Sequence, residues 1–176
     1  MGYTHYLERK EKLPTAKWKP FIEDAKKILD TADCPLTHGE IRDGQWFDVD
    51  GYKADNEVLH FNGKDEDSHE TMHISRVYKS ESWERGQDEP MKFTFCKTAR
   101  KPYDKYVTAI ALLASFHFGK DVKNSSDGEQ SDWEAGKKVL EDTLGIKTQW
   151  TDDFAIKLVG EREETKKTQK TPKYVK

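Results

Sequence analysis

Three cationic side chains occupy a short stretch where a predicted strand ends and a predicted helix begins. Lys97, Arg100 and Lys101 follow the alternating strand pattern of residues 91–95, and Pro102 then favours the first turn of a helix. The first amides of a helix lack intrahelical partners and point outward, and nearby Lys or Arg side chains add positive charge. The stretch is therefore typical of a site for an anion such as phosphate.

A second polar segment, residues 125–128 (Ser-Ser-Asp-Gly), follows the next predicted strand. A strand, a helix and a strand in succession usually form a right-handed crossover between parallel strands, and ligands bind at the carboxyl ends of such strands. If the two strands are neighbours, the cations face this segment. Lys and Arg bind phosphate, and Asp127 can accept from hydroxyl or amine donors, so the pair of loops suits a ligand with phosphate and a sugar or base. Alternatively, the cations only solvate a turn and Asp104 interacts with the helix dipole.

Residues 69–73 read His-Glu-Thr-Met-His and match the zinc-peptidase pattern His-Glu-x-x-His. That mechanism needs a helix, on which both histidines share a face and the glutamate acts as general base. Thr71, Ile74 and Val77 favour a strand, and no further histidine stands at the extended-motif spacing. We therefore expect no metal. His69 stays a candidate for phosphate binding or acid catalysis.

The two cysteines, Cys34 and Cys96, are too few for a disulfide framework or a four-cysteine zinc site, and a reduced cytoplasmic setting is expected. Cys96 is not expected to be a phosphatase nucleophile, because Pro102 stands where that class needs its loop-closing arginine. A cysteine at the end of an apolar strand is commonly buried and inert. Cys96 therefore has no expected role in catalysis. Because binding without turnover is favoured, no catalytic residue is assigned, and no cofactor is expected.

Charged residues make up 36% of the chain, hydrophobic residues 34%, and the formal net charge is −3. Both signs are interspersed, so no attraction to bulk nucleic acid or to an anionic membrane is expected. The longest apolar run, residues 107–118, is too short to span a bilayer, and Tyr6 stands where a myristoylation signal needs Ser or Thr. A folded, soluble protein is expected. The Tyr3, His5 and Tyr6 cluster could stack on a base or ring, but aromatics in strands more often lie in the core.

Apolar periodicity predicts helices at residues 18–30, 102–118 and 132–144. Residues 91–145 read as a strand, helix, strand, helix unit. The predicted fold class is α/β: a single two-layer domain over residues 1–160, with a mixed β-sheet covered mainly on one face by the three helices. Residues 161–176 have almost nothing to bury and are expected to form a flexible charged tail.

The remaining segments give weaker patterns. Strands are predicted at residues 2–8, at residues 58–62 and 71–78, which pair antiparallel, and around Ile156. Residues 34–56 are predicted to form a long loop with at most a short edge strand. Ser131 and Glu134 predict a capping box at the start of the third helix.

Six blocks of the sequence share one resemblance. They are residues 2–6 (Gly-Tyr-Thr-His-Tyr), 61–63 (Phe-Asn-Gly), 68–71 (Ser-His-Glu-Thr), 95–104, 125–128 and 132–133 (Asp-Trp). Together they resemble a family of small, mostly uncharacterised phage and prophage proteins, over about residues 1–145. Block 95–104 is the most specific, and His73 is not part of the pattern. The resemblance implies a phage-encoded protein of the host cytoplasm and no established reaction.

Small phage proteins with a basic, polar pocket often act against host immunity by holding or cleaving nucleotide signals, an inference by analogy. We expect a binding protein that sequesters a phosphate-bearing small molecule, most simply a nucleotide-derived host immune signal. One alternative is a phosphodiesterase-like hydrolase that uses His69 with Glu70 or Asp127. Another is an inhibitor of a host defence protein that acts through the Trp83 loop or the tail. The protein could also form a homo-oligomer. The residues expected to bind the ligand are Asn62, His69, Glu70, Lys97, Thr98, Arg100, Lys101, Tyr103, Asp104, Ser126 and Asp127.

Overall fold

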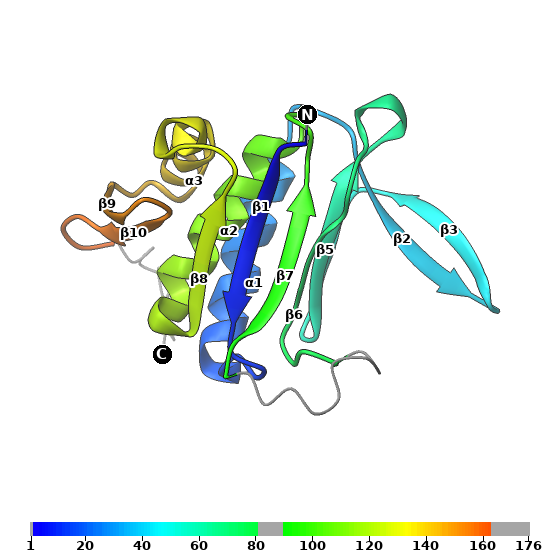
Figure 1. Cartoon of the computed structure of the whole chain (residues 1–176), viewed down its shortest axis with the longest axis horizontal. Coiled ribbons are helices and arrows are strands. Elements are labelled where there is room, and N and C mark those ends of the chain that lie inside the picture. The colour runs from blue at the N-terminus through cyan, green and yellow to red at the C-terminus, as the bar shows by residue number, and fades with distance from the viewer. Residues whose placement is uncertain (1, 81–89, 163–176) are drawn as a thin grey trace, which may run out of the picture.

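A computed structural model describes residues 2–80 and 90–162 of the chain (Figure 1). The α-helices of this part are α1 (Thr15–Asp30), α2 (Asp104–Phe118) and α3 (Glu134–Leu144). Its strands are β1 (Thr4–Arg9), β2 (Leu36–Arg42), β3 (Gln45–Asp50), β4 (Lys53–Ala54), β5 (Val58–Gly63), β6 (Met72–Ser75), β7 (Lys92–Lys97), β8 (Val122–Ser126), β9 (Thr148–Asp152) and β10 (Ala155–Leu158). The predicted α/β class is confirmed, including the strand, helix, strand, helix order of β7, α2, β8 and α3.

The central sheet has β1 in the middle, β7 on one side and β8 on the other. Both outer strands pair with β1 in the antiparallel sense, so they run parallel to each other. They are not direct neighbours, which differs from the simplest form of the predicted crossover. The carboxyl ends of β7 and β8 nevertheless reach the same edge, where β1 begins (Figure 1).

A second sheet continues beside β7. Strand β5 pairs with β2, β4 and β6, and its antiparallel pairing with β6 confirms the prediction for residues 58–62 and 71–78. Strand β6 lies next to β7, and the amide of Glu70 donates to the carbonyl of Lys97 (3.1 Å) above them. In chain order, β1, α1, β6, β7, α2 and β8 follow the β-α-β-β-α-β scheme of split βαβ folds, with β2 to β5 as an addition.

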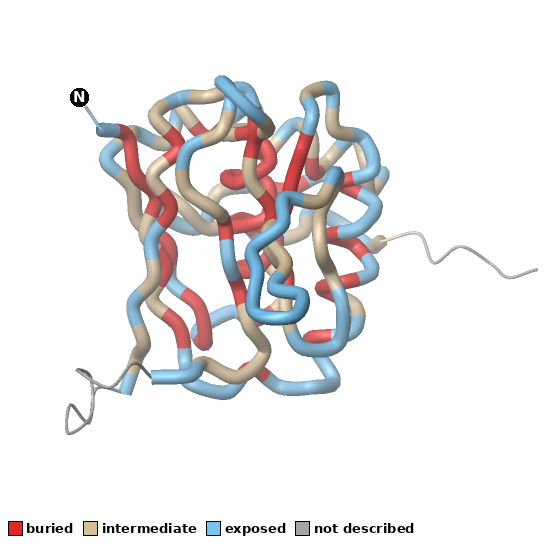
Figure 2. The backbone as a smooth tube through the Cα atoms, turned by 90° about the vertical axis from the view of Figure 1, so that its right-hand side faces the viewer, coloured by how far each residue is buried: buried red, intermediate tan, exposed pale blue. Residues whose placement is uncertain are grey.

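Helix α2 forms the centre of the core. Residues 106–115 are all buried, which is typical of a helix that is covered on every side. Helices α1 and α2 lie behind the sheet, and α3 packs on α2 at its side (Figure 1). In Figure 2 the buried segments gather inside the molecule. Because α2 is enclosed, its first residue, Asp104, is held in a fixed position at the edge where β1 begins.

Most of residues 34–56 lie in strands β2, β3 and β4, so the predicted long loop is wrong. Strands β2 and β3 make a hairpin that projects from the body of the molecule (Figure 1). Asp43 and Gly44 close it with φ values of 51° and 75°, and positive φ at both positions is the geometry of the type I′ turn that joins adjacent strands.

Several predicted ends also differ from the structure. Helix α2 begins at Asp104 and not at Pro102, and the predicted last strand is a hairpin of β9 and β10. The capping box that precedes α3 consists of Glu129 and Asp132, whereas Ser131 and Glu134 were predicted. Trp83 and residues 163–176 of the predicted tail lie outside the described residues. No helix within residues 2–80 and 90–162 is long and apolar enough to cross a membrane.

Candidate functional site

The candidate site is the edge of the central sheet where β7 and β8 end and β1 begins. We call it the strand-end surface and define it by residues 3–6, 97–104 and 126–132. The basic turn, residues 97–101, is held against β1 because the amides of Thr98 and Ala99 donate to the carbonyl of Tyr3 (3.0 and 3.3 Å). The amide of Asp127 donates to the carbonyl of Thr4 (3.0 Å) from the other side. The two loops therefore converge as predicted, with β1 between them.

His5 connects the three segments of this surface. Its Nε2 lies 2.8 Å from Oδ1 of Asp104, and its Nδ1 lies 2.9 Å from Oγ of Ser126. The hydroxyl of Thr98 donates to the same oxygen of Asp104. The imidazole is only 4% exposed and meets the rings of Tyr3 and Trp133 edge-on, with centroids 4.8 and 5.1 Å away. His5 thus ties the start of α2 to the end of β8.

Arg100 lies over the aromatic ring of Tyr3. The centre of its guanidinium is 3.8 Å from the ring centroid, and Nη1 donates to Oδ1 of Asp132 (3.0 Å). Tyr3 is buried, and burial, followed by the charges of Asp104 and Asp132, raises the pKa of its hydroxyl to about 12. The Arg100 side chain itself is exposed, so it offers N–H donors to a ligand on an ordered aromatic base.

Lys97 and Lys101 have no carboxylate partner among the described residues. The aliphatic part of Lys97 passes over Gly2, where a Cβ atom would lie 2.5 Å from Cε of the lysine. The ammonium group of Lys101 donates to the carbonyl of Glu66 (2.6 Å). Both charges are therefore open to an added anion.

Asn62, Glu70 and Tyr103 are engaged inside the protein. Oε2 of Glu70 accepts from the amide of Lys97 (2.7 Å), and the hydroxyl of Tyr103 donates to the carbonyl of Glu70 (2.7 Å). Asn62 bonds to the carbonyl (3.0 Å) and the amide (3.1 Å) of His69, whose side chain is exposed. These predicted ligand residues shape the loop next to the basic turn, and of this group only the His69 ring is open to a ligand.

Ser126 and Asp127 lie at the other end of the surface. The hydroxyl of Ser126 contacts His5 and also accepts from the amide of Gly128 (3.0 Å). Asp127 is exposed, and its carboxylate accepts from the hydroxyl of Tyr6 (2.8 Å) and from the amide of Thr4 (3.0 Å). Both predicted residues are therefore placed by β1, across the strand end from the cations.

The basic turn contains two consecutive residues with left-handed backbone. Ala99 and Arg100 have φ values of 50° and 57°, which L-residues other than Asn and Asp rarely adopt. Such conformations persist where the surroundings fix them, and they gather at functional sites. In this turn they carry the Arg100 side chain over Tyr3.

Ala99→Gly is expected to raise the free energy of unfolding by about 1 kcal/mol, because glycine relieves the left-handed strain and loses part of the gain through its flexible unfolded state. Thermal unfolding measures the change. Ala135→Gly in α3 is the matched control and should instead lower stability by about 1 kcal/mol, since that alanine is helical. An equal decrease in the free energy of unfolding in both variants would show that the turn is unstrained.

The expected ligand-binding residues did not include Tyr3, His5 and Asp132, although these residues organise the surface. Tyr3 and His5 were assigned to the core as strand aromatics, and they are buried. The available signal was a histidine on the inward face of an alternating strand, which needs hydrogen-bond partners when buried. Those partners lie about a hundred residues away in the chain, so the local pattern could not name them.

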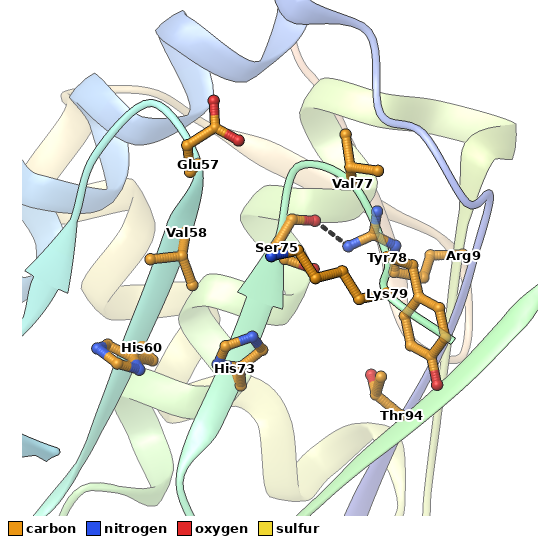
Figure 3. A pocket seen from close by; sticks show the side chains of 10 residues that line it. All are labelled: Arg9, Glu57, Val58, His60, His73, Ser75, Val77, Tyr78, Lys79 and Thr94. Carbon is orange, nitrogen blue, oxygen red and sulfur yellow. Dashed lines mark hydrogen bonds between the residues drawn. The ribbon is translucent and has the colours of Figure 1, made fainter. Parts of the chain in front are cut away.

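A cavity of about 570 Å³ lies between β6 and β7, toward the opposite end of these strands (Figure 3). Arg9 lines it, but its guanidinium donates to carbonyl oxygens of the chain: those of Lys10, Glu11, Ser75 and Arg76. His60 and His73 lie side by side on another wall, with ring centroids 5.6 Å apart. Because the Arg9 donors already bind the backbone, this cation is a structural cross-link and not an anion site.

His60, which lines this cavity, is expected to make the stability of the protein depend on pH. Burial, followed by the charges of His73, His38 and Lys53, lowers the pKa of His60 to about 4 from 6.5, against a small opposing effect of Asp55. The unfolded chain therefore takes up this proton first as the pH falls, and stability is lost between pH 6.5 and 4, by roughly 1–3 kcal/mol.

His60→Gln should flatten the dependence of the unfolding free energy on pH in that window, as measured by urea denaturation at a series of pH values. His69→Gln, at an exposed ring, is the matched control and should keep the slope. The same slope in both variants would mean that another group titrates.

The described residues, 2–80 and 90–162, contain no cluster of three or more His, Cys, Asp or Glu side chains able to hold a metal ion. His73 of the His-Glu-x-x-His match lies in β6, and His69 lies before that strand. Burial raises the pKa of the Cys96 thiol well above its usual range, and the chain has both cysteines in the free form. Comparison with protein-family models, with curated proteins and with solved structures finds no match for this chain.

Proposed function

We propose that this protein binds a phosphate-bearing small molecule, a nucleotide-derived signal, at the strand-end surface and holds it without converting it. The observation that carries the proposal is the gathering of Lys97, Arg100 and Lys101 at one sheet edge, with no carboxylate on either lysine among the described residues. Three cations within one turn match the charge of one or two phosphate groups.

The neighbouring side chains supply contacts for a sugar or base. The exposed carboxylate of Asp127 keeps lone pairs for hydroxyl or amine donors beyond its bonds to Tyr6 and Thr4. The exposed ring of His69 lies on the other side of the basic turn, next to Glu70. A ligand that spans the surface would therefore meet phosphate-binding groups in the middle and polar groups at both ends.

The hydrogen bonds around Ser126 favour binding over turnover. A serine nucleophile must give its proton to a base and present free lone pairs to the substrate. Ser126 already accepts from the amide of Gly128, and the imidazole beside it is buried. The carboxylates of Asp104 and Glu70 are likewise occupied by internal donors. This arrangement supports a binding role more than a catalytic one.

The second candidate is a hydrolase, and the placement of His5 favours it. An imidazole that bonds a carboxylate through one nitrogen and a serine hydroxyl through the other has the connectivity of a catalytic triad. The acid or base would then be His5 and not His69, which the sequence suggested.

The biological setting follows from the resemblance to phage proteins. We propose a phage-encoded protein that acts in the host cytoplasm and sequesters an immune signal. Support comes from the placement of the blocks that carry the resemblance: residues 2–6, 95–104, 125–128 and 132–133 all contribute to the strand-end surface.

Incubation with a panel of nucleotides, including mononucleotides, dinucleotides and cyclic dinucleotides, tests the proposal. At least one is expected to raise the melting temperature, by an amount that grows with the logarithm of its concentration once the site is saturated, and to be recovered intact by chromatography after denaturation of the protein. Conversion of the nucleotide, lost in His5→Gln, would establish the hydrolase instead. If no member of the panel shifts the melting temperature, the proposed class of ligand is wrong.

A further inference from the structure

We propose that the outer face of the central sheet binds a short single-stranded nucleic acid, whose bases stack on Tyr6, Phe93 and Phe95. This face adjoins the strand-end surface and shares Tyr6 and Lys97 with it, but Phe93 and Phe95 lie outside that surface. The inference does not rest on the small-molecule proposal. It uses side chains that the sequence assigned to a core strand.

The three aromatic rings form a continuous platform across two adjacent strands. Tyr6 of β1 pairs directly with Phe95 of β7, and the rings of Tyr6 and Phe93 are stacked with centroids 5.8 Å apart and planes 24° apart. The rings of Phe93 and Phe95 follow at 6.2 Å. Neighbouring rings at these distances can each carry one unpaired base.

The platform faces away from the helices. Alternation along β7 turns Cys96 inward, where it is 2% exposed, and leaves Phe93 and Phe95 52% and 57% exposed. Helices α1 and α2 cover the opposite face of the sheet (Figure 1). Large aromatic side chains stabilise a fold when they are buried. Where they stay exposed together on an open face of a sheet, they mark an interaction site.

Lysines flank the rings. Lys97 ends the same strand, and Lys123 stands on β8 opposite Glu8. Beyond β6, a hollow of about 840 Å³ continues along the neighbouring sheet, with Lys53, Lys79 and the 65% exposed Trp46 in its lining. Three acidic groups lie along the same path: Glu8, which pairs with Phe93, Asp127, whose carboxylate accepts from the hydroxyl of Tyr6, and Glu40, which also lines the hollow. Four lysines thus face three carboxylates along a path that a phosphate backbone could follow.

The occupant that fits is a single strand of nucleic acid. Stacking on an aromatic ring requires unpaired bases, which a duplex does not offer. The net charge of −3 disfavours tight binding of long nucleic acid. A short strand that is held mainly by stacking is compatible with this charge. Aromatic residues on the two central strands of a β-α-β-β-α-β sheet are also how one common class of RNA-binding domain stacks two or three bases.

Fluorescence anisotropy with labelled oligouridine and oligothymidine of about eight nucleotides tests the proposal on the full chain. The wild-type protein is expected to bind at least one of them with a Kd below about 100 μM at low salt. Phe93→Ala with Phe95→Ala should weaken binding at least about tenfold, because each stacked base contributes measurably to affinity. A duplex of the same length should bind more weakly than the single strand.

Val159→Ala, which removes another exposed apolar side chain (47% exposed), is the matched control and should bind like the wild type. The double variant should also keep the nucleotide binding of the strand-end surface, which separates the two sites. Absence of saturable binding to either strand, or equal binding by the double variant, would overturn the proposal. A dimer of the wild type that the double variant dissociates, with no oligonucleotide bound, would assign the face to a second copy of the chain.

Discussion

Arg100→Ala is expected to weaken nucleotide binding about a hundredfold and, combined with Lys97→Ala, to abolish it, because charge-assisted hydrogen bonds to phosphate contribute about 1.5–3 kcal/mol each. Arg100 is exposed, and its ion pair with Asp132 is a surface pair. Its removal should therefore change the free energy of unfolding little. Isothermal titration with the nucleotide that gives the largest shift in melting temperature measures the affinity.

Lys138→Ala is the matched control, since that lysine is exposed and paired with Asp142 in α3, away from the strand-end surface. It should leave the affinity unchanged. A lower nucleotide affinity of Arg100→Ala than of Lys138→Ala would assign the phosphate site to the basic turn. Equal affinity of wild type and Arg100→Ala would show that the cations of residues 97–101 only solvate a turn, the alternative that the sequence left open.

His5→Leu is expected to lower the free energy of unfolding by about 2–4 kcal/mol, because it removes two hydrogen bonds of a buried ring, one of them to a carboxylate. Leucine fills much of the same space but cannot bond to Asp104 or Ser126. The strand-end surface should lose its order as well, since His5 and Thr98 together hold the Asp104 carboxylate. Urea denaturation gives the stability, and the nucleotide titration gives the effect on binding.

Ser126→Ala separates the two contacts of the imidazole. It removes the hydroxyl that bonds Nδ1 and the amide of Gly128 but leaves the contact with Asp104, so a loss near 1 kcal/mol is expected. A His5→Leu variant as stable as the wild type would contradict the role of His5 as the connection between β1, α2 and β8.

The part of the site that could be predicted from sequence rests on local signals. A basic turn between an alternating strand and an apolar helix predicts that the turn lies at a sheet edge, and the crossover rule brings the segment after β8 to the same edge. Both are found, even though β1 separates β7 from β8. The rule holds because it depends on strand direction and not on direct pairing.

The long-range bonds could not be predicted. His5 meets Asp104 and Ser126 across the fold, and nothing in residues 3–6 alone distinguishes a connecting histidine from a strand residue. For Phe93 and Phe95, the alternating pattern correctly predicted that both side chains share one face of the strand. It could not predict which face of the sheet the helices cover. That choice is set by the tertiary packing of α1 and α2.

The error at residues 34–56 has a local cause. The hairpin of β2 and β3 has exposed side chains over most of its length, so it lacks the alternation of buried and exposed positions that identifies a strand. The Asp43-Gly44 pair was the available signal, because Asp-Gly favours a type I′ turn.

Native mass spectrometry of the protein purified from phage-infected cells tests the central claim most directly, with Arg100→Ala prepared in parallel. The account predicts that the wild-type protein carries an added mass of a phosphate-bearing small molecule that appears as an intact nucleotide after denaturation, and that the variant lacks it. The bare polypeptide mass for both proteins, or the same added mass on both, would contradict the assignment of the strand-end surface as a nucleotide-binding site.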